Sequence, residues 1–157
     1  MLLKPMVHLC MGLAYRVSCS WVRLRGQPLQ GVAVAIWHAG ELLVVQHSYR
    51  PGYSLPGGLI KKREDPNEAA CRELREEVGI VIRPDELILI SDERIGRFDD
   101  YIFEYRPVER PQIEIDNWEI VEAQFVDPAG IRNKDSSVEG YLRRIGAASR
   151  ARPVLQS

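Results

Sequence analysis

The chain has 157 residues, of which 45% are hydrophobic and 27% charged, and this composition is typical of one soluble globular domain. The formal net charge of −1 argues against stable nucleic-acid binding driven by overall charge. The three cysteines fit no metal-ligand spacing and leave an odd thiol, which predicts a reducing, cytoplasmic location.

The first segment, residues 1–25, is mostly apolar but is interrupted by charged residues such as Lys4 and Arg16. It has neither the uninterrupted apolar core and cleavage site of a signal peptide nor the low charge of a transmembrane segment. Its apolar residues recur at helical spacing: Leu2, Met6, Leu9, Leu13, Val17 and Trp21. We therefore predict an amphipathic helix packed on the domain or on a partner subunit in a homodimer, with attachment to a membrane surface as the alternative.

Residues 26–150 are predicted to form one α/β domain. Val32 to His38 and Glu41 to His47 are rich in Val, Ile and Leu and flank Ala39-Gly40, which predicts a hairpin. Further strands are predicted at residues 59–60, 86–91, 101–105 and 119–126, helices at 66–78 and 138–148, and polar connections at 92–100 and 107–117. Asp127-Pro128 is predicted to begin a turn or short helix. Residues 151–157 are predicted to form a loose tail.

The helix at 66–78 has clear end signals and an acidic face. Asp65 and Pro66 are typical of an N-cap and a first helical residue, and Gly79 of a helix stop. Its glutamates at i, i+3 and i+4, which are Glu73, Glu76 and Glu77, repel one another by roughly 0.2–0.5 kcal/mol per pair unless a cation neutralises them. Oxygen ligands favour Mg²⁺ or Mn²⁺, while a solvated acidic face is the alternative.

The segment from Gly58 to Ile80 contains a complete signature. It reads Gly58, five residues, Glu64, seven residues, Arg72-Glu73-Leu74, one residue, Glu76-Glu77, one residue and Gly79-Ile80. In this respect the chain resembles the Nudix hydrolases, and in particular the MutT-like members. Residues 53–58 resemble the aromatic-x-x-Pro-Gly-Gly lead-in of that family, with Tyr53 in place of the usual tryptophan, and residues 119–125 resemble a late strand. The resemblance implies a Nudix-type alpha/beta/alpha sandwich with a mixed β-sheet.

The same resemblance implies an activity. Nudix hydrolases cleave a nucleoside diphosphate linked to another moiety by attack of water on phosphorus, with Mg²⁺ or Mn²⁺ as cofactor. A nucleoside triphosphate, a nucleotide sugar and an ADP-ribose-like compound all remain open as the small-molecule substrate. The alternative is a catalytically silent Nudix domain that binds a nucleotide as a sensor or scaffold. The intact set of box carboxylates favours the enzyme.

Site residues follow from the resemblance. The catalytic set is Arg72, Glu73, Glu76 and Glu77, in which Glu73 is a ligand or the general base, and Arg72 is an orienting partner within reach of Glu76 and Glu64. The implied metal ligands are the Gly57 carbonyl, Glu64, Glu73, Glu76, Glu77 and one acidic residue from a later loop, for which Glu119, then Glu122, then Glu114 are the candidates.

Substrate contacts are predicted outside the signature. Arg50 lies in the loop that ends at the glycine pair, and its charge suits phosphates. Arg97 offers a second cation, and Tyr53 could stack on a nucleobase. The histidines at positions 8, 38 and 47 are too scattered to predict a metal site, and a structural or exposed role is expected for each.

Overall fold

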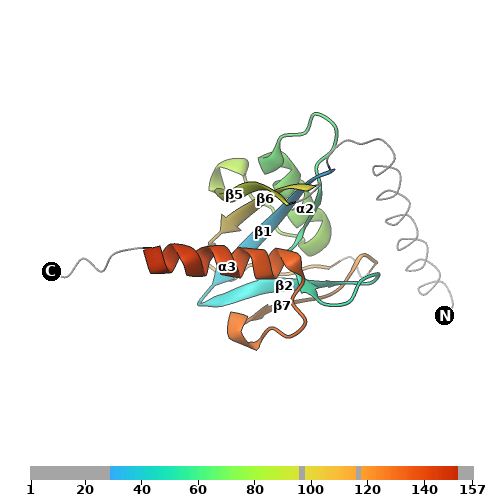
Figure 1. The fold of residues 1–157 in the computed structure, drawn as a ribbon. Coiled ribbons are helices and arrows are strands. Elements are labelled where there is room, and N and C mark those ends of the chain that lie inside the picture. The colour runs from blue at the N-terminus through green and yellow to red at the C-terminus, as the bar shows by residue number, and fades with distance from the viewer. Residues whose placement is uncertain (1–28, 96–97, 116–117, 152–157) are drawn as a thin grey trace, which may run out of the picture.

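The computed structural model describes residues 29–95, 98–115 and 118–151 (Figure 1). The predicted helix at 1–25, its packing in a homodimer, Arg97 and residues 152–157 of the predicted tail lie outside these residues and remain predictions. No helix within the described ranges has the length and hydropathy needed to cross a membrane.

The described residues form a seven-stranded mixed sheet with two α-helices and two short 3₁₀ helices. The strands are β1 (Leu29–His38), β2 (Glu41–His47), β3 (Tyr53–Ser54), β4 (Gly57–Leu59), β5 (Ile88–Ile95), β6 (Phe98–Tyr105) and β7 (Ile120–Val126). The helices are α2 (Pro66–Val78), α3 (Ser136–Ala151), η1 (Pro84–Glu86) and η2 (Pro128–Gly130).

The sheet divides into two halves that diverge from the β1–β2 hairpin. The hairpin turn is confirmed, with Ala39 and Gly40 at φ 50° and 84°, but β1 and β2 pair only at their turn ends. Further from the turn, β1 pairs with β4 and with β6, to which it runs parallel, while β2 pairs with β3 and β7. The main path through the sheet is therefore β3-β2-β1-β6-β5.

The two helices pack on opposite faces of the sheet (Figure 1). Successive strand residues point to opposite faces, so Val34 and Ile36 of β1 join the core under α2, while Ala35 joins the core under α3. Leu74 and Val78 of α2 are fully buried, and each contributes about 1.5–3 kcal/mol of hydrophobic free energy. The predicted alpha/beta/alpha sandwich with a mixed sheet is therefore confirmed.

The ends of α2 follow the sequence prediction. The Asp65 carboxylate accepts a hydrogen bond of 2.9 Å from the backbone N–H of Asn67, and Pro66 occupies the first helical position. Gly79 ends the helix at φ 72°, a left-handed conformation that glycine adopts without steric penalty.

Other boundaries differ from the prediction. The polar connection predicted at 92–100 is wrong, because β5 extends to Ile95 and β6 begins at Phe98. Pairs such as Glu93 with Asp100 are joined through backbone groups, and this pairing does not require apolar side chains. The C-terminal helix is longer than predicted, since α3 spans Ser136–Ala151. The short helix predicted after Asp127 is present as η2.

Candidate functional site

The glycine pair at the start of β4 lies directly against two carboxylates of α2. The backbone N–H of Gly57 donates a 2.8 Å hydrogen bond to Glu77 Oε2. A Cβ atom at Gly57 would lie 2.1 Å from the carbonyl oxygen of Val32, so only glycine allows β4 this close to β1. A Cβ atom at Gly58 would lie 2.5 Å from the Glu73 carboxyl group. The two glycines therefore make room for the acidic face of the helix.

Arg72 joins the acidic residues into one cluster. Its guanidinium binds Glu64 through two hydrogen bonds, Nε to Oε1 at 2.7 Å and Nη2 to Oε2 at 2.9 Å. Nη1 donates to Glu73 Oε1 at 2.6 Å and to Glu76 Oε2 at 3.3 Å, and Nη2 also donates to the Leu59 carbonyl at 3.0 Å. The predicted reach of Arg72 to Glu76 and its return to Glu64 are both confirmed.

The four box glutamates lie in different electrostatic surroundings. The hydrogen bonds from Arg72 lower the pKa of Glu64 to about 2. Burial raises the pKa of Glu73 although Arg72 opposes this, and burial raises the pKa of Glu77 well above its ordinary range. Glu77 is 4% exposed, whereas the side chain of Glu76 is half exposed. A buried carboxylate is unfavourable without a cation, so Glu77 has the strongest electrostatic need for one.

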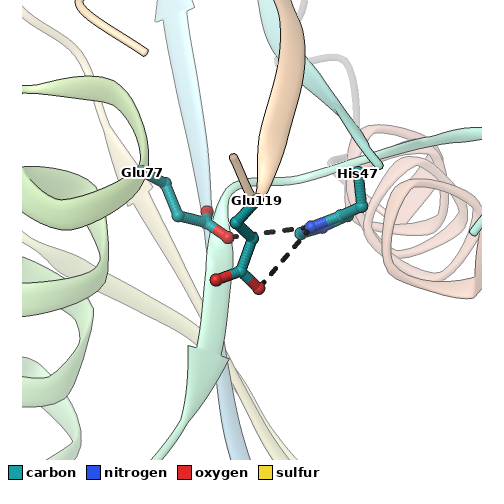
Figure 2. Close-up of side chains that lie close together, drawn as sticks. All are labelled: His47, Glu77 and Glu119. Carbon is teal, nitrogen blue, oxygen red and sulfur yellow. Dashed lines mark ion pairs between the residues drawn. The ribbon is translucent and has the colours of Figure 1, made fainter. Parts of the chain in front are cut away.

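A second group extends the acidic site to the other half of the sheet. His47, at the end of β2, has its Nδ1 atom 4.0 Å from Glu77 Oε1 and 4.0 Å from Glu119 Oε1 (Figure 2). One potential ligand atom from each of the three residues lies within 4.8 Å of the others. The Tyr49 hydroxyl donates to Glu119 Oε1 at 2.9 Å. Burial lowers the pKa of His47 to about 3, with Arg50 contributing. The three side chains come from β2, from α2 and from the residue before β7.

The sequence places His47 nearest to the presumed cleft but predicts a structural or exposed role for it, and its contact with the acidic site was not predicted. The two-residue periodicity of the strand could have indicated this contact, because His47 follows Leu43 and Val45 at alternate positions on the face of β2 that packs towards α2. The sequence did not reveal that the acidic turn of α2 lies over the end of β2.

Of the three later acidic residues, only Glu119 has a contact with this group among the described residues. The Glu122 carboxylate instead accepts hydrogen bonds from the Tyr53 hydroxyl and from Gln124 Nε2. Glu114 lies against Gly79, which ends α2, and its N–H donates to the carbonyl of Val78. Glu119, which the sequence ranked first, is therefore the one of the three that lies beside Glu77, and its role as a ligand remains a prediction.

Arg50 and Tyr53, the predicted substrate-binding residues that the structure describes, lie beside β2. Arg50 forms a 3.6 Å ion pair with Asp135, and with His47, Tyr49 and Val121 it lines a pocket of about 410 Å³. Tyr53 is half-buried, and its hydroxyl is held between Glu122 and Gln124. Arg50 is thus close to the carboxylates, while Tyr53 is tied into the sheet.

These donors fit a divalent cation. Glu77 supplies a buried carboxylate and Glu73 a half-buried one, whereas Glu76 and Glu119 are more exposed. Both ring nitrogens of His47 are buried without a hydrogen-bond partner in the described parts of the chain. Carboxylate-rich donor sets bind hard ions such as Mg²⁺ and Mn²⁺, and imidazole is a common ligand for the later transition metals. Both Glu64 oxygens, in contrast, already accept hydrogen bonds from Arg72, and one also accepts from the N–H of Lys61.

Comparison with known proteins gives consistent results. A MutT-like protein of Streptomyces ambofaciens is 36% identical over 63 residues, which cover 38% of this chain and 41% of that relative's length. The MutT NUDIX hydrolase from Burkholderia pseudomallei has a TM-score of 0.66 at 19% identity, covering 76% of this chain and 98% of that chain. An ADP-ribose pyrophosphatase from Streptococcus suis has a TM-score of 0.63 at 17% identity, and the match covers 80% of this chain and 96% of that chain.

The structural comparisons show a shared fold. The family follows from a match to the sequence model described as the NUDIX domain, which extends over residues 28–144 and so includes the glycine pair, α2 and β7. Since this match covers more than half of the chain, the protein belongs to the Nudix family.

Proposed function

We propose that the protein is a metal-dependent pyrophosphohydrolase that cleaves a nucleoside diphosphate linked to another moiety by attack of water on phosphorus. The main support is the position of Glu77. Its buried carboxylate lies between the Gly57 N–H and His47, and ligand atoms of His47, Glu77 and Glu119 lie within 4.8 Å of one another. Burial of an ionised carboxylate is unfavourable unless hydrogen bonds and a nearby cation compensate it.

The proposed cation ligands are Glu73, Glu76, Glu77, Glu119 and the Gly57 carbonyl. When bound, Mg²⁺ or Mn²⁺ would acidify a water molecule and neutralise the charge of the phosphate oxygens. Arg72 fixes the rotamers of Glu73 and Glu76 and, through Glu64, ties α2 to the loop before it. Glu64 therefore supports the site by way of Arg72.

Proton transfer is assigned to the buried part of the cluster. A general base must lie near the attacking water and have a pKa close to the working pH. Burial raises the pKa of Glu73, and its carboxyl group lies against Gly58. Glu73 therefore serves as a ligand or as the general base.

The proposed substrate is a nucleoside diphosphate derivative whose phosphates reach Arg50. This side chain lines the pocket beside His47, and its guanidinium is suited to phosphate oxygens. Nucleoside triphosphates, nucleotide sugars and ADP-ribose-like compounds share the required diphosphate, and the activity named for the Streptococcus suis neighbour supports the last class. The free thiol of Cys71 is consistent with a cytoplasmic location.

A substrate panel tests this function. The protein is assayed with Mg²⁺ or Mn²⁺ against nucleoside triphosphates, nucleotide sugars and ADP-ribose, together with the variants Glu76→Gln and Glu77→Gln. We expect hydrolysis by the wild type and a loss of roughly a hundredfold or more in both variants, since each lacks a charged ligand.

The control is Glu68→Gln, which removes an exposed glutamate from the first turn of the same helix. It should keep full activity, and circular dichroism should show that all three variants are folded. Near-normal turnover in Glu76→Gln and Glu77→Gln would contradict the proposal. Nucleotide binding without hydrolysis of any compound would favour a silent sensor or scaffold instead.

A further inference from the structure

His47 is a deeply buried, ionisable side chain at the acidic site that the proposed mechanism does not use. It is 3% exposed, and neither ring nitrogen has a hydrogen-bond partner among the described residues. Buried polar groups in folded proteins are nearly always satisfied by a partner. A buried imidazole with two unsatisfied nitrogens therefore points to a partner that is neither a side chain nor a backbone group of this part of the chain.

The surroundings of the ring indicate what kind of partner it has. The Nδ1 atom lies 4.0 Å from Glu77 Oε1 and 4.0 Å from Glu119 Oε1, too far for hydrogen bonds (Figure 2). With metal–ligand bonds of about 2.1 Å, two ligand atoms of one cation lie about 3.0 Å apart when adjacent and about 4.2 Å apart when opposite, so both distances from Nδ1 fall within the range of a shared cation. The spacing of the three side chains therefore suits a shared cation better than direct contact.

An ion pair with a protonated imidazole explains this arrangement less well. Burial disfavours the charged form of an imidazole, and His47 is only 3% exposed, with its ring beside the positive charge of Arg50 in the same pocket. A neutral imidazole has a lone pair available for a metal ion. The ring also packs against Tyr49 with 5.2 Å between centroids, and the Tyr49 hydroxyl donates to Glu119, so the same residue contacts both candidate ligands.

We infer that His47 is a ligand of the proposed cation site through Nδ1, so that the site has a mixed nitrogen and oxygen donor set. This inference depends on the proposed function, because the cation is the one that Glu77 and Glu119 would hold. Imidazole strengthens the preference for cobalt and zinc ions over Mg²⁺ beyond that of an all-carboxylate site. The site should therefore bind Co²⁺ more tightly, relative to Mg²⁺, than it would without His47.

The first experiment detects the nitrogen ligand directly. The purified protein is loaded with Mn²⁺ and examined by pulsed electron paramagnetic resonance, which detects the nuclear spin of a nitrogen bound to the ion. The chain has three histidines, so the double variant His8→Gln/His38→Gln retains His47 alone. We expect a ¹⁴N coupling in this variant that is replaced by a ¹⁵N coupling when the protein is labelled with ¹⁵N-histidine.

The second experiment measures selectivity by calorimetric titration with Co²⁺ and Mg²⁺. The Kd for Co²⁺ should rise at least about tenfold in His47→Gln. The Kd for Mg²⁺ should change much less. The matched control is His38→Gln, because His38 lies at the far end of the hairpin with its ring against Phe125. This control should retain the Co²⁺ preference of the wild type.

The possible outcomes separate the inference from the function on which it depends. Mn²⁺ binding without a histidine coupling, or an unchanged Co²⁺ preference in folded His47→Gln, would overturn the role of His47 and leave the hydrolase proposal intact. Both the role of His47 and the proposed function would be overturned if the wild type bound no divalent cation, or if Glu77→Gln bound the cation as tightly as the wild type. If His47→Gln does not fold, the labelling experiment on the double variant decides alone.

Discussion

Single residues in this site are fixed by the space that their neighbours leave. Gly58 is the clearest case, because a Cβ atom there would lie within 2.5–2.8 Å of three atoms of the Glu73 carboxyl group. The constraint comes from a functional side chain and not from the backbone of the core, so it is a constraint on activity more than on stability.

The substitution Gly58→Ala tests this constraint. We expect kcat to fall by up to about a hundredfold, because the added methyl group displaces Glu73 from its position and small displacements in an active site have effects of that size. Unfolding by urea should show little change. The control is Gly130→Ala, where a Cβ atom would meet nothing within 4 Å. Full activity in Gly58→Ala would contradict the assignment of Glu73 to the site.

A pH-dependent prediction concerns the pair of Glu64 and Arg72. The pKa of Glu64 is about 2 in the folded protein, below its ordinary value of 4.5. A carboxyl group with a lowered pKa stabilises the fold above pH 4.5, and this contribution is lost as pH falls through 2. We expect Glu64→Gln to lower the free energy of unfolding by about 1 kcal/mol at pH 7, after allowance for screening by solvent.

The difference in the free energy of unfolding between wild type and Glu64→Gln should decrease steadily as the pH falls from 4.5 to 2. Urea unfolding at several pH values measures it. A difference of the same size at pH 7 and at pH 2.5 would mean that the stabilisation does not come from the ionised carboxylate.

At the scale of one element, α2 performs two tasks. One side presents Ala70, Leu74 and Val78 to the core, and the other presents the glutamates to the site. Burial of the apolar side and the caps at Asp65 and Gly79 stabilise the helix, and together they offset the mutual repulsion of its carboxylates.

The N-cap can be tested without touching the site. We expect Asp65→Ala to lower the free energy of unfolding by about 1 kcal/mol, because the N–H of Asn67 loses its acceptor. The value of kcat should hold, since Glu73 lies two turns further along the helix. The comparison variant is Asp85→Ala, whose partner Arg83 is three-quarters exposed, so that little stability is lost. Equal losses in both variants would contradict the capping role.

At the scale of the whole molecule, the sheet separates the acidic site from a second polar network. On the face covered by α3, the Tyr141 hydroxyl donates to the buried Glu104 carboxylate and accepts from Trp37 Nε1. Arg106 Nε donates to the other Glu104 oxygen at 2.6 Å. This network joins α3 to β1 and β6 without contributing to the α2 side.

We expect Tyr141→Phe to lose about 1–3 kcal/mol of stability, because it leaves Glu104 and Trp37 each short of a buried partner. Hydrolysis at temperatures below the transition should be unchanged. Thermal unfolding and a standard assay measure the two effects. The control is Tyr105→Phe, whose hydroxyl makes no hydrogen bond within the described residues. A loss of activity without a loss of stability would contradict this separation.

Local chemistry explains what the sequence alone could determine. The helix at 66–78 was predictable because Asp65, Pro66 and Gly79 act on their immediate neighbours. The hairpin at Ala39-Gly40 was predictable for the same reason. The order of Gly58, Glu64 and Glu73 was sufficient to recognise the family, because a signature is itself a property of sequence.

The tertiary structure alone decided which distant residues meet that signature. His47, Tyr49 and Glu119 lie near Glu77 because the end of β2 pairs with the start of β7. This pairing depends on contacts between residues that are 70 or more positions apart in the chain, such as Tyr49 and Glu119. The length of β5 and β6 was likewise set by backbone pairing to a neighbour. Periodicity and capping act within a few residues, whereas the remainder of this site is assembled by long-range packing that no local pattern encodes.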